Sequence, residues 1–230
     1  MSTMQPETTG LTTDRLESSK RSRWPLIGTA AGITGFVATL VTDVHVGSES
    51  ATSAVVDEIS RGKAHASLVA GFLTVALLVV LAAAWRRHVE PRVASSTAAR
   101  VVSNGVLLSA AALALGYGWK GSLAIYLQGG INGETGGFDR EGLYMTYVLN
   151  DFGSYIGWLG VVIAAGAIAW MAFRERTVSR WIGVVACVPV LAVTAMAVMT
   201  GLPGFPGLVG PPFLVIAFTG LAFGKSTITR

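Results

Sequence analysis

The chain has 230 residues, of which 52% are hydrophobic and only 13% are charged, and its formal net charge is +4 at pH 7. Soluble proteins carry about 25% charged residues, so this composition argues against an ordinary soluble domain. The single cysteine, Cys187, excludes a disulfide framework and a zinc site built on cysteines. The basic residues flank apolar runs instead of forming one basic face, which argues against a nucleic-acid partner.

A polar N-terminal tail, residues 1–22, precedes six apolar segments. The tail is rich in Ser and Thr and lacks apolar periodicity, so we expect it to be disordered. Each apolar segment is close to the length of about 20 residues with which a helix crosses roughly 30 Å of hydrocarbon. The first is too long for the core of a cleaved signal peptide, so we expect it to remain. The predicted spans are Pro25–Thr42, Ala66–Trp85, Val101–Trp119, Ser154–Phe173, Trp181–Thr200 and Gly207–Phe223.

These segments predict an all-α polytopic integral membrane protein, a bundle of six transmembrane helices. The transmembrane domain covers residues 23–225, and residues 226–230 form a short C-terminal tail. The Ala, Gly, Val and Arg bias is typical of a GC-rich bacterial source. We therefore expect a multi-pass protein of the bacterial inner (plasma) membrane.

The charged residues between the spans predict the orientation of the bundle. In a six-span model, 13 of the 17 Lys and Arg residues fall on one side of the membrane and eight acidic residues fall on the other. Positive residues stay on the cytoplasmic side, so both termini are expected to be cytoplasmic. The basic side holds Arg15, Lys20, Arg21, Arg23, Arg86, Arg87, Arg92, Arg100, Arg174, Arg176, Arg180, Lys225 and Arg230. The acidic side holds Asp43, Glu49, Asp57, Glu58, Glu134, Asp139, Glu141 and Asp151.

Three segments carry further structural signals. Ala51–Arg61 has its apolar residues on one side and Asp57 spaced to pair with Arg61, which predicts a short amphipathic helix on the outer surface. Glycines crowd residues 129–142, and the amphipathic segment Leu143–Phe152 follows them. The Gly-rich segment and the amphipathic segment together form either a lid over a cavity or a surface loop with a helix lying along the membrane. Pro189 should kink the fifth span.

A metal site is one hypothesis for the outer face. His45 follows the first span and His65 precedes the second, so a tight hairpin would bring both imidazoles near Asp43. Two imidazoles and a carboxylate are suitable ligands for zinc, copper or iron. Their spacing matches no recognised ligand signature, and histidine is common at membrane interfaces, so interfacial side chains without a metal are the alternative.

Lys120 has two alternative placements. If the third span ends at Trp119, the Lys120 side chain extends outward to water. If the helix continues to Leu127, Lys120 lies about 10 Å below the surface and needs Asp151 or Asp43 as its partner. The five tyrosines lie towards the outer side, where rings of this kind form a membrane-interface belt, and Tyr147 or Tyr155 would line an outer cavity if one exists.

Several membrane mechanisms lack the residues that they require. No span contains a histidine at mid-depth to bind haem, or an acidic residue or histidine there to couple transport to an ion. The sequence also lacks Walker, HExxH and GxSxG motifs. No cofactor is specified, and the question of catalysis stays open.

Three functions are compatible with these features of the sequence. The sequence favours a non-catalytic accessory or assembly subunit that packs, within the lipid bilayer, on another membrane protein or on a second copy of itself. The second is a membrane-embedded enzyme or a cofactor- or metal-binding protein, whose outer site would contain Asp43, His45, His65, Lys120, Asp151, Tyr147 and Tyr155. The third is a passive transporter of a small neutral or lipidic solute.

The arrangement resembles a broad group of small six-span bacterial membrane proteins without an assigned activity. The resemblance rests on the outer segment that ends in Arg61-Gly62-Lys63-Ala64-His65, on Arg86-Arg87 after the second span, and on Val178-Ser179-Arg180-Trp181 before the fifth. It covers residues 25–224 as a pattern. It implies a membrane protein of the cell envelope and assigns no catalytic residue.

Overall fold

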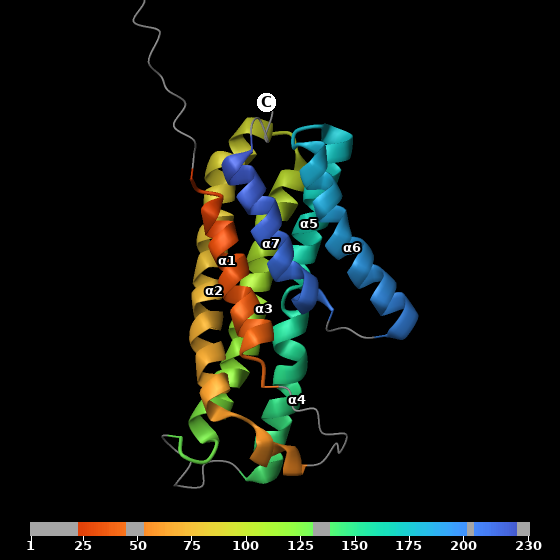
Figure 1. The fold of residues 1–230 in the computed structure, drawn as a ribbon. Coiled ribbons are helices and arrows are strands. Elements are labelled where there is room, and N and C mark those ends of the chain that lie inside the picture. Colours follow the sequence, from red (N-terminus) through yellow and green to blue (C-terminus); the bar gives the residue numbers. More distant parts are fainter. Residues whose placement is uncertain (1–22, 45–52, 131–138, 202–204, 225–230) are drawn as a thin grey trace, which may run out of the picture.

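The computed structural model describes residues 23–44, 53–130, 139–201 and 205–224, and these residues form helices and turns without a β-strand (Figure 1). The all-α prediction is therefore confirmed over this part of the chain. The tail predictions for residues 1–22 and 226–230 lie outside the described residues. The helices are α1 (Leu26–Phe36), α2 (Arg61–His88), α3 (Thr97–Tyr126), α4 (Arg140–Ile156), α5 (Leu159–Trp170), α6 (Arg180–Thr200) and α7 (Pro206–Phe223).

Short turns of other helical types extend or connect these helices. A π-helical turn, Val37–Val41, continues α1, and a second one, Met171–Glu175, continues α5. The 3₁₀ turns Ser53–Glu58 and Glu90–Val93 precede and follow α2.

Within the described residues, five helical segments are long and apolar enough to cross a membrane, with mean hydropathy between 1.6 and 2.5. They are α2, α3, α6, α7 and the continuous segment Arg140–Glu175, which comprises α4, α5 and the π-helical turn after α5. The segment Leu26–Val41 is apolar but shorter. These lengths and compositions support a multi-pass membrane protein.

Two helices extend beyond the predicted spans. The third helix does not end at Trp119 but continues to Tyr126, because Lys120 has buried partners and apolar residues follow it. The fourth does not begin at Ser154: α4 begins at Arg140, where the Asp139 carboxylate accepts a hydrogen bond from the Gly142 N–H at 2.8 Å.

Leu143–Phe152 is consequently neither a lid nor a helix lying along the membrane. It belongs to α4, which runs antiparallel to α3 and continues into α5 (Figure 1). Leu143 and Tyr147 are buried on one side of α4, whereas Met145, Leu149 and Phe152 are exposed on the other.

Glycines let the central helix α3 approach α4 and α5 at backbone distance. A Cβ added to Gly116 would lie 2.6 Å from the carbonyl carbon of Gly153, and one added to Gly105 would lie 2.5 Å from the Gly160 carbonyl oxygen. Such contacts replace the hydrophobic effect as the force between helices in lipid. They fix the register of α3 against its two neighbours.

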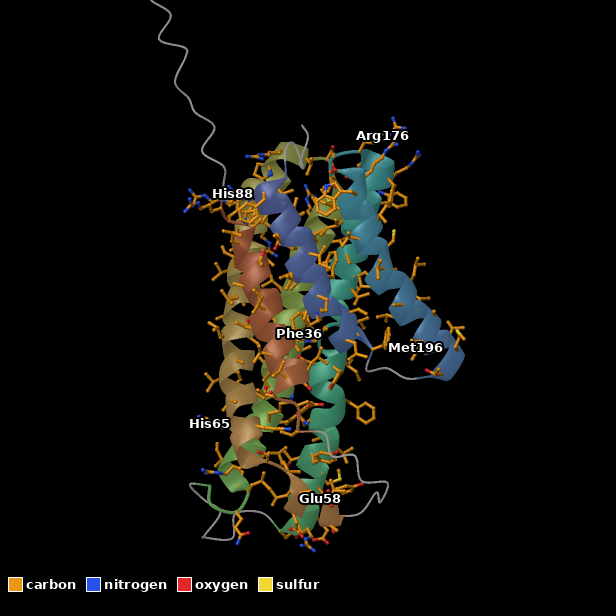
Figure 2. The ribbon with its side chains drawn as sticks, viewed as in Figure 1. Phe36, Glu58, His65, His88, Arg176 and Met196 are labelled. Atoms are coloured by element: carbon orange, nitrogen blue, oxygen red, sulfur yellow. The ribbon has the colours of Figure 1, made fainter. Side chains whose placement is uncertain are left out.

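The bundle has two chemically different ends. The basic end carries Arg86, Arg87, Arg92, Arg100, Arg174, Arg176 and Arg180, and the acidic end carries Asp57, Glu58, Asp139 and Glu141 together with Arg61, Lys63 and Arg140. Figure 2 shows His88 and Arg176 at one end and Glu58 at the other. At the acidic end, the predicted Asp57–Arg61 pair was wrong, because Asp57 pairs instead with Arg140 of α4.

Helix α6 separates from the rest of the bundle. It contacts α5 and α7 near the basic end and then leans away, so that Met196 lies far from the other helices (Figures 1 and 2). The predicted kink residue, Pro189, is buried within this helix. Beyond it, Val198 and Met199 are more than 80% exposed.

Candidate functional site

A fully buried lysine occupies the half of the bundle next to the acidic end. The Lys120 side chain is 0% exposed, and its Nζ donates to the Ala38 carbonyl oxygen at 3.0 Å and to Asp43 Oδ1 at 3.3 Å. Of the two placements that the sequence left open, the structure contains the buried one, with Asp43 as a partner. An ionisable side chain inside a helical bundle is rare, because desolvation costs several kcal/mol per ion.

Asp43 connects this lysine to helix α4. Its Oδ2 accepts a hydrogen bond from the Tyr155 hydroxyl at 2.8 Å, and its Oδ1 also accepts one from the Val44 N–H at 2.9 Å. The Asp43 side chain is 17% exposed, so this carboxylate reaches the edge of the buried region. Three predicted site residues, Asp43, Lys120 and Tyr155, therefore meet in space.

The π-helical turn at the end of α1 provides the carbonyl that Lys120 uses. The Thr42 N–H donates to the Val37 carbonyl, five residues back, at 2.9 Å. The Ala38 carbonyl is thereby available to the Ser67 hydroxyl at 2.6 Å as well as to Lys120. Such π-turns are frequent at functional sites.

A second layer of hydrogen bonds lies beside this turn. Thr39 Oγ1 is 2.8 Å from the Tyr117 hydroxyl and accepts a hydrogen bond from Trp158 Nε1 at 3.1 Å. All three side chains are fully buried. Tyr117 was therefore wrongly assigned to the membrane-interface belt.

Asn150 of α4 is a buried polar residue that the sequence did not single out as a site residue. Its side chain is 0% exposed, and neither its amide nitrogen nor its amide oxygen has a hydrogen-bond partner within the described part of the chain. A buried amide without partners costs about 1–3 kcal/mol per group. The one sequence signal for it is its position in an amphipathic segment, four residues before Ser154.

The helix register places Asn150 at the level of Lys120. Gly116 and Gly153 are in contact where the antiparallel helices α3 and α4 meet. Lys120 follows Gly116 by about one turn towards the acidic end, and Asn150 precedes Gly153 by about one turn in the same direction. We name Asp43, Lys120, Asn150 and Tyr155, with the Ala38 carbonyl, the polar centre.

An apolar layer covers the polar centre on the side of the acidic end. It contains Tyr147, another predicted site residue, packed with Val44, Val55, Val56, Ile59, Leu123, Leu127 and Leu143. Closer to that end lies a pocket of about 390 Å³, which Asp57 and Arg140 help to line. Four residues of the apolar layer also line this pocket: Val56, Ile59, Leu127 and Leu143.

The other predicted site residues do not join the polar centre in the described structure. His65 is exposed on α2 and points away from the bundle (Figure 2). His45 lies outside the described residues, and so does the Asp151 side chain, although Asp151 is part of α4. Within the described residues no group of three His, Cys, Asp or Glu side chains is placed to hold a metal ion, so the metal site of Asp43, His45 and His65 stays a prediction.

Comparison of the chain with models of protein families, with curated proteins and with solved structures found no match.

Proposed function

We propose that this protein is a six-span bacterial inner-membrane protein with both termini in the cytoplasm. The separation of a basic end from an acidic end supports this orientation, because basic residues are retained on the cytoplasmic side. The basic end would then face the cytoplasm, and the polar centre would lie in the outer half of the membrane.

Cysteine labelling tests this topology in a Cys187→Ser background. A thiol introduced by Lys63→Cys, at the acidic end, is expected to react with a membrane-impermeant maleimide in intact cells. One introduced by Arg92→Cys, at the basic end, is expected to react only after the membrane is permeabilised. The reverse pattern would contradict the proposed orientation.

The function that the geometry supports best is binding of a small polar solute at the polar centre. The observation that carries this proposal is the buried Asn150 amide, which has no hydrogen-bond partner among the described residues and lies at the level of the buried Lys120–Asp43 pair. Buried ion pairs are weak contributors to stability, so a polar centre of this kind points to binding rather than to folding.

The chemistry of the centre selects a class of solute. The Lys120 ammonium already has the Asp43 carboxylate as a partner, so a neutral molecule fits better than a further ion. The Asn150 amide offers one acceptor group and one donor group, which suits a hydroxyl or carboxamide that both donates and accepts. The proposed ligand class is therefore a small neutral solute with hydroxyl or amide groups.

Small molecules retained by the purified protein provide the test. Protein extracted from its own host membrane and analysed by native mass spectrometry is expected to carry one small polar compound. Asn150→Leu should abolish its retention, whereas Lys63→Met, which changes an exposed lysine at the acidic end, should leave it unchanged. Equal small-molecule content in the wild type and the Asn150→Leu variant would overturn the proposal, provided that both unfold cooperatively.

A second candidate function is that of a subunit that packs on another membrane protein through α6. The observation that favours it is the divergence of the α6 C-terminal half, where Val198 and Met199 are 82% and 81% exposed. The same native mass spectra test it: a stoichiometric membrane-protein partner, lost on Val198→Lys, would support this role. A chain without a partner would contradict it.

A further inference from the structure

An apolar groove of about 430 Å³ lies between α5 and α6, in the half of the bundle next to the basic end. Gly166 and Trp170 form part of its α5 wall, and Val190 and Leu191 form part of its α6 wall. Arg174, which is exposed, lines it at the basic end. The groove thus combines apolar walls with a cation at one end.

The separation of α6 from α5 produces this groove. Near the basic end the two helices touch, since a Cβ added to Gly183 would lie 2.5 Å from the Ala172 Cβ. Further along, a Cβ added to Gly166 would meet its nearest neighbour, Val190, only at 3.5 Å. Beyond that point α6 leans away from the bundle (Figure 1). A side chain at residue 166 would partly fill the gap, and glycine leaves it open.

The length of the groove matches one leaflet of a bilayer. Gly166 and Arg174 are eight residues apart, which corresponds to about 12 Å along a helix. One leaflet contributes about 15 Å, half of the roughly 30 Å hydrocarbon core. The apolar walls therefore extend from the level of the inner lipid head groups towards the middle of the membrane.

The charge at the end of the groove selects the kind of lipid. The Arg174 guanidinium lies where a head group would lie when an acyl chain occupies the groove, and guanidinium groups bind phosphate oxygens with two parallel hydrogen bonds. Trp170, which is 57% exposed, is a ring of the kind enriched at this membrane depth. An anionic phospholipid satisfies both the apolar walls and the cation.

We propose that the groove between α5 and α6 is a binding site for one anionic phospholipid of the inner leaflet, with an acyl chain against Gly166, Val190 and Leu191 and its phosphate at Arg174. This site is separate from the polar centre and does not depend on solute binding there; its assignment to the inner leaflet rests on the orientation proposed above.

Native mass spectrometry of the full-length protein, titrated with phosphatidylglycerol and with phosphatidylcholine of the same chain length, tests the proposal. The wild type is expected to retain one phosphatidylglycerol in preference to phosphatidylcholine. Arg174→Gln should weaken phosphatidylglycerol retention about fivefold, the contribution of one basic residue at a membrane surface. It should weaken phosphatidylcholine retention less, because the choline cation already offsets the charge of that lipid's phosphate. Arg87→Gln is the matched control, because Arg87 is an exposed basic-end residue on α2 that does not line the groove.

A second variant separates the acyl chain from the head group. Gly166→Leu should fill the groove and reduce the retention of both lipids, and Leu191→Trp should do the same from the α6 wall if Gly166→Leu fails to fold. Equal retention of the two lipids by the wild type, or equal effects of Arg174→Gln and Arg87→Gln, would overturn the proposal. A protein partner that displaces the lipid from the groove would overturn it as well.

Discussion

Removing the Asp43 carboxylate should destabilise the protein far more than removing the Lys120 ammonium. Asp43→Leu removes the Asp43 carboxylate from a fully buried ammonium, for which a loss of about 3–5 kcal/mol in unfolding free energy is expected. Lys120→Met leaves a carboxylate that is partly exposed and still accepts hydrogen bonds from Tyr155 and Val44. Its expected loss is about 1–2 kcal/mol.

The double variant tests whether the two effects come from one interaction. Replacing a whole buried ion pair by apolar side chains is often neutral, so Asp43→Leu combined with Lys120→Met should cost no more than about 2 kcal/mol. The sum of the single effects should then exceed the double effect by at least about 2 kcal/mol.

Equilibrium unfolding in detergent micelles, followed by tryptophan fluorescence, gives the four free energies of this cycle. Asp57→Asn is the control, because Asp57 and Arg140 form an ion pair near the same end whose side chains are 61% and 51% exposed. Breaking an exposed pair should produce no measurable change. Additive single effects, or equal losses for Asp43→Leu and Asp57→Asn, would refute the reasoning.

Two further predictions concern the packing around the polar centre, and both use the same unfolding measurement. Gly116→Ala places a methyl group against the α4 backbone and should cost about 1–3 kcal/mol of unfolding free energy. Gly118→Ala, whose added methyl group meets no atom within 4 Å, should be neutral or stabilising by up to about 1 kcal/mol. Equal effects of the two variants would contradict the close helix contact. Thr39→Val keeps the shape of the side chain but removes the hydrogen-bond partner of the buried Trp158 indole and Tyr117 hydroxyl, so a loss of about 1–3 kcal/mol is expected. A neutral Thr39→Val would show that these two groups find other partners.

The helices could be predicted because each apolar run carries its own signal of length and composition. The end of the third helix could not be settled because a polar residue there is buried by a partner that lies far away in the sequence. Lys120 ended the predicted third span, yet Asp43, 77 positions earlier, allows the helix to continue past it. No local pattern contains that information, because the partner becomes adjacent only when the π-helical turn after α1 folds beside α3.

The candidate site could be predicted in part. Charge and position were enough to single out Asp43, Lys120 and Tyr155, which the structure brings together. Asn150 was missed because a single amide in an amphipathic segment resembles a solvated residue until the register of α4 against α3 is known. The π-helical turn could not be predicted either, since it depends on Ser67 and Lys120 binding the carbonyl of Ala38.

Backbone packing already brings the helices around the polar centre together. The contacts of Gly116 with Gly153 and of Gly105 with Gly160 bring α3 against its neighbours through backbone packing, without any charged group. A bundle packed in this way gains little from an ion pair whose desolvation cost rivals its attraction. If the apolar double variant is as stable as expected, folding does not explain why Lys120 and Asp43 are present. Their presence, at the level of a buried amide that has no hydrogen-bond partner in the described part of the chain, is then best explained by what the centre binds.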